Sequence, residues 1–335
     1  MRIAVDAMGG DFAPVETVKG AVEAAEKNPA VSKILLIGVS DIIKKELSKL
    51  SHIPNKIEIV HASECIGMEE QPVMAVKRKT DSSINRGVEM VKANEADAFV
   101  SMGNTGAVMV ASALKLGTLE GVKRPALAVV MPALNRPFIL IDAGANTDCT
   151  PEMLVQFAAM GSVYSSTVIK REKPVVGLLN VGGEAGKGNE VTKEAYNILS
   201  NTHFNFRGNV EGHDIFKGET DVIVCDGFVG NVVLKTSESA AHAIVTWMRQ
   251  EFKKNPIRIA GALILKGAFN ALKKRTDPSI YGGALLLGVK GICIIGHGAS
   301  RSKAVFHAIS LASKSAHSGL NERIIQEISQ LKVTK

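Results

Sequence analysis

Short apolar runs alternate with longer amphipathic stretches along all 335 residues of the chain. The runs typical of strands lie at Ile34–Ile37, Ile57–Val60, Ala98–Val100, Leu127–Val130, Phe138–Ile141, Val175–Leu179, Val222–Val224 and Ile292–Ile295. Helical patterns between them include Val15–Lys27, Ser83–Asn94 and Glu152–Ser166. Several runs are apolar on both faces, as strands covered by helices on both sides are. The alternation predicts an α/β protein with three layers around a mainly parallel, doubly wound sheet. Without a repeat or linker, residues 1–335 are expected to form one continuous domain.

Glycine and polar residues gather just after the predicted strands, beginning after the short run Arg2–Val5. The residues singled out there are Asp6, Gly9, Gly10, Asn104, Thr105, Gly106, Asp142, Asn146, Lys187, Asn189, Asp226, Gly227, Asn231, His297 and Ser300. Carboxyl ends of parallel strands lie at one edge of a sheet, so we expect these residues to meet in one ligand cleft.

Each of these clusters alone has a simpler explanation as a turn or a helix cap. In the string Gly-Asn-Thr-Gly, for example, Thr105 would serve as the N-cap. The alternative is an anion site, because free N–H groups and the helix dipole at a helix N-terminus attract phosphate. Helix starts are also predicted at Pro14 and at Thr150-Pro151-Glu152, since proline suits the first helical position. In combination the clusters favour a ligand cleft.

Composition narrows the partners and the compartment. A net charge of +7 and a pI near 9.1 suit an acidic partner such as a carrier protein, an anionic membrane or a phosphorylated substrate. Aromatic residues make up only 4% of the chain, which argues against a base-stacking surface for nucleic acid. Four widely spaced cysteines are typical of a reduced cytosolic protein. The first residues contain no apolar signal core, and no apolar run is long enough to span a membrane.

Familiar catalytic motifs do not fit. The Gly182–Gly188 loop has one residue too few for a Walker loop, and Gly296-His297-Gly298 is not followed by the last glycine of a dinucleotide fingerprint. Neither a G-x-S-x-G elbow nor an H-E-x-x-H metal motif occurs, so we expect no metal and no cofactor. The cysteines are predicted to be small core residues rather than nucleophiles. The disfavoured alternative concerns Cys149 alone, because a helix start beside it can lower the pKa of a thiol.

Several strings in the chain resemble those of one enzyme family. They are D-A-M-G-G-D-x-A-P at the start, then S-x-G-N-T-G-A, D-x-G-A-N, Q-F-A-x-M-G-S-V-Y, L-L-N-V-G, K-G-N-E-x-T, D-G-F-x-G-N-V-x-L-K-T and Y-G-G-A-x-L-L-G. In this order they are similar to the bacterial phosphate acyltransferases (acyl-acyl-carrier-protein:phosphate acyltransferases) of phospholipid synthesis. The family usually has a histidine where this chain has Phe12.

The resemblance implies a fold like that of isocitrate and isopropylmalate dehydrogenases and of phosphotransacetylases, and a homodimer. It implies transfer of a fatty acyl group from acyl carrier protein to inorganic phosphate, which gives acyl phosphate for phosphatidic acid synthesis. Lys187, Asn231 and Asp226 become the expected catalytic residues, with Asn189 beside them. Without a nucleophile in the chain, we expect phosphate to attack the thioester directly, helped by positioning and by stabilisation of the oxyanion.

A basic and apolar segment, residues 238–277, is predicted to be helical and to project from the body. On one helix through residues 253–275, apolar Ile257, Ile264, Leu265, Ala268 and Leu272 share a face, opposite Lys266, Lys273 and Lys274. The candidates for contact with a membrane surface are Ile257, Leu263, Ile264, Leu265 and Phe269. Packing at a dimer interface explains the pattern equally well. The family resemblance implies a cytoplasmic protein at the membrane periphery, which supplies acyl phosphate to a membrane glycerol-phosphate acyltransferase.

Three other functions stay open on the sequence. A metal- and NAD-dependent decarboxylating dehydrogenase shares the expected fold, but would need an arginine cluster and metal-binding aspartates that the sequence does not reveal. A phosphotransacetylase that uses coenzyme A is closer in chemistry. A basic adaptor for membrane or nucleic acid would not need the dense Gly/Asn strand ends, so the enzyme is favoured and no nucleic-acid partner is expected.

Overall fold

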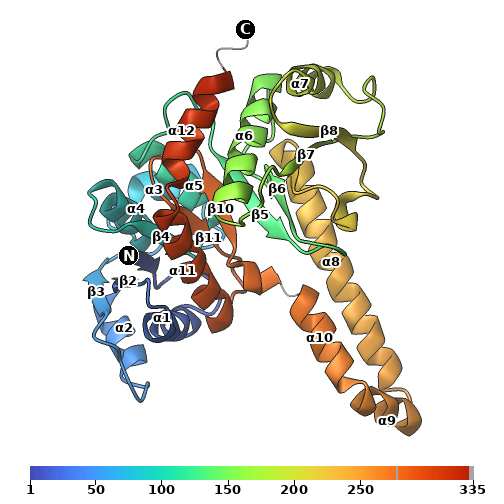
Figure 1. Cartoon of the computed structure of the whole chain (residues 1–335). Coiled ribbons are helices and arrows are strands. Elements are labelled where there is room, and N and C mark those ends of the chain that lie inside the picture. Colours follow the sequence, from blue (N-terminus) through green and yellow to red (C-terminus); the bar gives the residue numbers. More distant parts are fainter. Residues whose placement is uncertain (277, 332–335) are drawn as a thin grey trace.

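The strands form one continuous sheet (Figure 1), seen in a computed structural model that describes residues 1–276 and 278–331. The side chains of residues 270, 273–276 and 278 are not described. The strands are β1 (Arg2–Asp6), β2 (Lys33–Gly38), β3 (Ile57–His61), β4 (Ala98–Ser101), β5 (Ala126–Met131), β6 (Phe138–Ile141), β7 (Val175–Leu179), β8 (Asn205–Val210), β9 (Val222–Val224), β10 (Ala284–Leu287) and β11 (Cys293–Ile295). Their order in the sheet is β3-β2-β1-β4-β11-β10-β5-β6-β9-β7-β8.

Helices cover both faces of this sheet. They are α1 (Val15–Lys27), α2 (Ser40–Leu47), α3 (Pro72–Arg78), α4 (Ser83–Lys92), α5 (Thr105–Lys115), α6 (Pro151–Thr167), α7 (Glu190–Ser200), α8 (Gly227–Phe252), α9 (Pro256–Ile264), α10 (Lys266–Thr276), α11 (Ser302–His317) and α12 (Leu320–Leu331). Two short 3-10 turns lie at Ile215–Lys217 and Pro278–Tyr281.

The core divides into two layers at the sheet, because successive side chains of a strand point to opposite faces. In β1, Ile3 and Val5 belong to the core layer that contains side chains of α1, α6, α11 and α12, whereas Ala4 belongs to the layer on the other side, with side chains of α4 and α5. In Figure 1 the layer of α6, α11 and α12 lies in front of the sheet, and α3, α4 and α5 lie behind it. The predicted three-layer α/β class is therefore confirmed.

Seven of the ten strand pairs in the described residues are parallel, so the predicted mainly parallel sheet is confirmed, but three antiparallel pairs were not expected. β10 is antiparallel to both its neighbours, β11 and β5, and β5 is antiparallel to β6. The sheet therefore consists of two parallel blocks that run in opposite directions. The carboxyl ends of β1, β4 and β11 lie at one edge, called here the first edge, and those of β6, β9 and β7 lie at the opposite edge, the second edge. The expectation that all the polar strand ends meet at one edge is wrong.

Most elements lie where the sequence pattern places them. α1 has the predicted bounds, and α6 begins at Pro151 with the Thr150 hydroxyl accepting from the amide of Met153. Pro14, which was expected at the first helical position, is the N-cap of α1. β8 and β10 were not predicted, because Asn205–Val210 is largely polar and Ala284–Leu287 is flanked by glycines rather than by a helical pattern.

The second half of α8 forms, with α9 and α10, an arm that projects from the body (Figure 1). The arm corresponds to residues 238–276, and residue 277 of the predicted segment lies outside the described residues. Among the residues of α8, only Gly227 and Gly230 are buried, and α9 has no buried residue. The single helix predicted for residues 253–275 is wrong, since α9 starts at Pro256 after the N-cap Asn255 and ends before Leu265. The predicted basic face at Lys273 and Lys274 falls on side chains outside the described part.

Candidate active site

At the first edge, the predicted residues mainly hold loops in place. Asp6 is 1% exposed, and its carboxylate accepts from the Ser101 hydroxyl (2.7 Å) and the Met8 amide (3.1 Å). Burial raises the pKa of Asp6. A side chain at Gly9 would lie 2.4 Å from the Asp6 carboxylate and 2.7 Å from the Gly103 amide, so glycine is needed where these loops touch. Gly10 packs on Met102 in the same way.

Asn104 closes the start of α5 rather than opening it to an anion. Its Oδ1 accepts from the Ala107 amide (3.0 Å), so Asn104 is the N-cap and the prediction of Thr105 is wrong. Its Nδ2 donates to the carbonyls of Gly67, Met68 and Glu70 at 3.0–3.2 Å. A side chain at Gly106 would lie 2.5 Å from Pro72, which shows how closely this loop covers the helix start.

The loop after β11 packs against the loop after β1. The Asp11 amide donates to the Gly298 carbonyl (2.9 Å), and the Arg301 guanidinium lies 4.2 Å from the centre of the Phe12 ring. This cation–π contact gives Phe12 a packing role at the family's usual histidine position. His297 and Ser300 lie in the same turn, in which the Ser300 amide donates to the His297 carbonyl (2.9 Å).

At the second edge, three adjacent strands end in one row. Ile141 of β6 pairs with Val224 of β9, and Val224 pairs with Leu178 of β7. The loops that follow these strands therefore start side by side, about 4.8 Å apart. The segment after β6 carries Asp142 and Asn146. The segment after β9 carries Asp226 and Asn231, and the segment after β7 carries Lys187 and Asn189.

Asp142 organises the loop after β6. Its buried carboxylate accepts from the amides of Leu127, Gly144, Ala145 and Asn146 at 2.7–3.1 Å, and from Asn146 Nδ2 at 2.8 Å. Burial raises the pKa of Asp142 against the effect of these hydrogen bonds. Asn146 Nδ2 also donates to the Pro125 carbonyl (2.8 Å). Both side chains therefore shape the loop.

The start of α8 sits directly on this loop. Asp226 caps the helix, since its Oδ1 accepts from the Val229 amide (2.8 Å), and the Gly227 amide donates to the Asn146 carbonyl (2.7 Å). A side chain at Gly230 would lie 1.8 Å from the Asp142 carbonyl oxygen. Asn231 is exposed, and its Cβ would lie 3.5 Å from a Cβ at Gly144.

Lys187 lies exposed in the glycine-rich loop between β7 and α7. Across the described residues, no carboxylate forms an ion pair with it. Its backbone carbonyl accepts from Asn180 Nδ2 (3.1 Å). Asn189 is the N-cap of α7 and accepts from the Thr192 amide (2.9 Å). The second edge thus combines a free cation, an exposed amide and the N-terminus of a long helix.

Sequence reasoning did not single out Asn180, Asn209 and Gly230, which support this edge. Asn180 belongs to the family string L-L-N-V-G, but its side chain carries no charge. Asn209 lies in β8, a strand that the sequence did not predict. The alternative of an acidic thiol at Cys149 does not hold, because burial raises its pKa to about 12, with nearby Asp142 adding to the effect. Cys225 and Cys293 are buried core residues, as expected, whereas Cys65 and Cys149 are half-buried.

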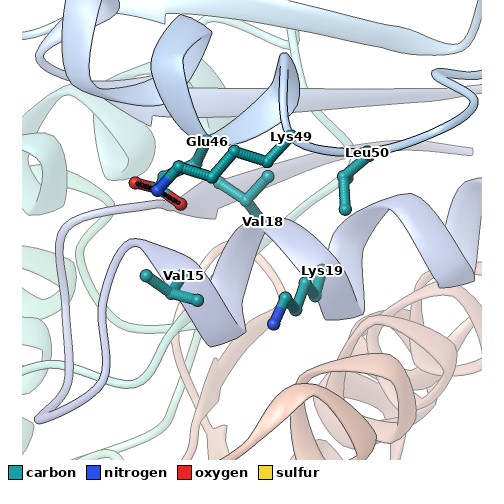
Figure 2. A pocket seen from close by; sticks show the side chains of 6 residues that line it. All are labelled: Val15, Val18, Lys19, Glu46, Lys49 and Leu50. Atoms are coloured by element: carbon teal, nitrogen blue, oxygen red, sulfur yellow. Dashed lines mark hydrogen bonds and ion pairs between the residues drawn. The ribbon is translucent and has the colours of Figure 1, made fainter.

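Hollows on the surface lie away from the predicted residues. One of about 360 Å³ lies between α1 and α2 (Figure 2), lined by Val15, Val18, Lys19, Glu46, Lys49 and Leu50. In it Lys49 pairs with Glu46 at 2.7 Å. Another, of about 430 Å³, lies along α8 between Lys235 and Ala243.

Glu211, His213 and Asp214 are close enough to share a metal ion, but they pair with one another at 3.4–3.8 Å.

Comparison with solved structures gives the class to which this fold belongs. Over 95% of this chain and 94% of the other, it is similar to a phosphotransacetylase from Streptococcus pyogenes, with a TM-score of 0.62 and 16% identity. A phosphotransacetylase from Staphylococcus aureus is similar with a TM-score of 0.59 and 14% identity, over 94% of each chain. The protein thus has the α/β fold of the phosphotransacetylases, the isocitrate dehydrogenase-like fold expected from the sequence.

The sequence places the chain more narrowly within this class. The family described as fatty acid synthesis protein matches residues 1–323. A phosphate acyltransferase of Dictyoglomus turgidum is 46% identical over 99% of this chain and 98% of its own length. A phosphate acyltransferase of Desulfitobacterium hafniense is 47% identical over 98% of this chain and 97% of its own. The chain therefore belongs to this family, as its strings predicted. The described helices include none that is both long and apolar enough to cross a membrane.

Proposed function

We propose that the protein transfers a fatty acyl group from acyl-acyl-carrier-protein to inorganic phosphate at the second edge. The observation that carries the proposal is that the segments carrying Asp142, Asn231 and Lys187 follow three adjacent strand ends, β6, β9 and β7, in a chain that matches phosphate acyltransferases over almost its whole length. The acyl phosphate formed would serve phospholipid synthesis at the membrane, where a glycerol-phosphate acyltransferase would consume it.

The reaction that we propose needs no covalent enzyme intermediate. A phosphate oxygen attacks the thioester carbonyl carbon, and the carbonyl oxygen becomes an oxyanion. The C–S bond then breaks, and the proton of hydrogen phosphate passes to the sulfur that leaves. The products are acyl phosphate and the carrier-protein thiol. The enzyme has to hold the two reactants in line and stabilise the oxyanion.

Each group at the second edge has a role in this scheme. The Lys187 ammonium is a mobile point charge that binds phosphate or the oxyanion. The Asn231 amide orients the thioester. Asp226 holds the first turn of α8, and the positive end of the helix dipole there favours negative charge. Asp142 and Asn146 fix the loop beneath them.

The remaining predicted binding residues act differently in this proposal. Asp6, Gly9, Gly10, Asn104 and Gly106 lie at the first edge, where their polar groups and close contacts hold loops together. We therefore assign them to the shape of the body rather than to substrate. His297, Ser300 and the exposed Thr105 also lie at the first edge, and the scheme gives them no contact with substrate.

The test is phosphate-dependent release of thiol from a long-chain acyl-acyl-carrier-protein, with the matching acyl-coenzyme A in parallel. We expect release from the carrier-protein thioester, with acyl phosphate as product. Turnover of only the coenzyme A ester would instead identify a phosphotransacetylase. No release from either would return the dehydrogenase and adaptor functions to consideration.

Lys187→Ala tests the site within the same assay. Loss of a charged group that acts on the transition state is expected to reduce kcat/KM by about a hundredfold or more. Lys193→Ala, on the neighbouring helix α7, is the matched control and should leave turnover unchanged. Full activity of Lys187→Ala would remove the assignment of this lysine.

We also propose that the arm serves assembly and membrane contact. Ile244 and Trp247 are 53% and 64% exposed on α8 and are neighbours on one helix face, which a second copy would bury. At the tip, Ile257 and Ile264 are 84% and 85% exposed beside Lys254 and Arg258, an arrangement that suits an anionic membrane surface. Phe269 packs on Phe252 at 5.0 Å, so it joins α10 to α8 rather than facing lipid. A molecular mass in solution equal to that of two chains would support the dimer.

A further inference from the structure

The Lys187 loop is held from an unexpected place, the outermost strand of the sheet. Asn209 of β8 is 8% exposed, and its Nδ2 donates to the Glu184 carbonyl within the loop (2.7 Å). Its Oδ1 accepts from Asn180 Nδ2 (3.1 Å). Asn180 Nδ2 also donates to the Lys187 carbonyl (3.1 Å), and Asn180 Oδ1 accepts from the Val181 amide (2.8 Å). One amide network therefore fixes both ends of the loop.

A β-bulge directs Asn209 toward this loop. Val176 of β7 pairs with Phe206, and Leu178 pairs with Asn209, so β8 has one extra residue in this stretch. The extra residue falls at Arg207–Gly208, where Gly208 has a φ of +97°, a conformation that suits glycine. A bulge reverses the alternation of side chains along a strand, and bulges often direct a side chain at functional sites.

The loop itself leaves little room for other arrangements. Gly188, beside Lys187, has a φ of +97°, and a side chain there would lie 2.5 Å from Asn180 Oδ1. A side chain at Gly182 would lie 2.9 Å from Lys187 Cγ. Lys187 Nζ has no ion pair within the described part of the chain. The loop backbone sets where the Lys187 side chain begins, and the side-chain amides of Asn180 and Asn209 hold that backbone.

From this network we infer that Asn209 is a positioning residue for the reaction: it holds the 181–188 loop so that the Lys187 ammonium stands over the second edge. The inference rests on the proposed function of Lys187. Asn209 does not touch substrate in this scheme and acts only through the loop. An error of about 1 Å in the place of a charged group costs about a hundredfold in rate, so a polar residue in a neighbouring strand can control turnover.

Two substitutions test the inference. Asn209→Asp keeps the shape and the acceptor for Asn180, but places a carboxylate oxygen against the Glu184 carbonyl. Asn209→Ala removes both hydrogen bonds. For each we expect the KM for phosphate to rise, or kcat to fall, about tenfold or more. Amide hydrogen exchange should become faster across residues 181–188. Asn205→Ala is the matched control, since Asn205 lies exposed on the same strand and donates only to the Lys173 carbonyl (3.3 Å).

The outcomes separate the two proposals. If Lys187→Ala lost turnover while both Asn209 variants matched Asn205→Ala in kinetics and exchange, the Asn209 inference would be wrong and the proposed function would stand. If the Asn209 variants melted earlier but kept the wild-type KM, kcat and loop exchange, Asn209 would be merely structural and the inference would also be wrong. If Lys187→Ala kept full turnover, the assignment of Lys187 would fail first, and the role of Asn209 with it.

Discussion

The polar side chains that the sequence singled out fall into two groups. Some have their hydrogen bonds satisfied within the fold, and others are exposed to solvent. Asn104 uses its carbonyl for a helix cap and its amide for three loop carbonyls. Asp142 accepts from five N–H groups. Asn231 and Lys187, by contrast, are exposed. The sequence made all four residues candidates for the site. Only their hydrogen-bond partners in the fold separate the two groups.

Asp81 provides a test of electrostatics at the residue scale. Its carboxylate accepts from the Ser63 amide (2.9 Å) and hydroxyl (2.6 Å) and pairs with Arg86 Nε (2.6 Å). These hydrogen bonds, with those from Ser63 the largest cause, hold the pKa of Asp81 well below its usual range. A lowered folded-state pKa stabilises the fold above the unfolded pKa of about 3.9, and this stability is lost as pH falls through the folded pKa.

Asp81→Asn is therefore expected to reduce the free energy of unfolding by about 1 kcal/mol at pH 7. The difference from wild type should narrow as pH falls below about 4. Urea unfolding at several pH values measures it. Asp41→Asn is the control, since the Asp41 side chain is 95% exposed. A difference that stays constant from pH 7 to pH 3 would contradict the argument.

At the scale of elements, the contact of α8 with the loop after β6 decides the geometry of the second edge. Gly230 allows the helix backbone to lie against the Asp142 carbonyl, where a Cβ would be only 1.8 Å from the oxygen. The Cβ and the carbonyl oxygen are both attached directly to backbone, so neither can move aside as the end of a flexible side chain could. Any larger residue at this position must move the helix start that carries Asp226 and Asn231.

Gly230→Ala is expected to destabilise the protein by about 1–3 kcal/mol and to reduce turnover, because the overpacked helix start shifts. Gly261→Ala, in the middle of α9, meets no atom within 4 Å and should stabilise its helix by up to about 1 kcal/mol. Urea unfolding and thiol release measure both effects. Similar stability and turnover for the two variants would show that the close contact at Gly230 has no energetic consequence.

The break between α8 and α9 was visible in the sequence. Asn255 precedes Pro256, and its side chain accepts from the Arg258 amide, as an N-cap followed by proline at the first helical position does. The apolar periodicity of residues 253–275 concealed this signal. Here local capping chemistry decided the structure, because no described side chain of the segment is buried in a way that would favour one continuous helix.

At the scale of the whole molecule, the arm differs from the body in the exposure of its apolar side chains. Its apolar side chains are exposed, whereas those of the body lie in two packed layers. An exposed apolar surface of this kind marks an interaction site. The two halves of the arm suit different partners, a second chain along α8 and a lipid surface at the tip.

Leu263→Asp and Ile264→Asp are expected to weaken binding to phosphatidylglycerol-containing vesicles while sparing turnover in solution, because each places a charge in the apolar tip. Vesicle co-sedimentation measures the binding, with phosphatidylcholine vesicles for comparison. Leu114→Asp is the matched control, since Leu114 is 62% exposed on α5 in the body. Equal binding by the tip variants and the control would count against the membrane surface.

The amino-acid sequence by itself determined the local elements, the three-layer class and the family. Apolar runs and caps act over a few residues, so α1, α6, β6 and β7 lie at the predicted positions. The strings that identify the family extend along the chain and need no tertiary contact to be recognised. The family resemblance, together with their place after strands, also made Lys187, Asn231 and Asp226 the catalytic candidates.

Only the tertiary structure decided which strand ends meet. A buried strand has the same apolar pattern in either direction, so the reversal at β10, β5 and β6 leaves no mark in the sequence. That reversal places Asp6 and Asn104 at one edge and Asp142, Lys187 and Asp226 at the other. The support of Lys187 by Asn209 has the same origin, because it depends on a long-range pairing of β8 with β7 and on the bulge at Gly208.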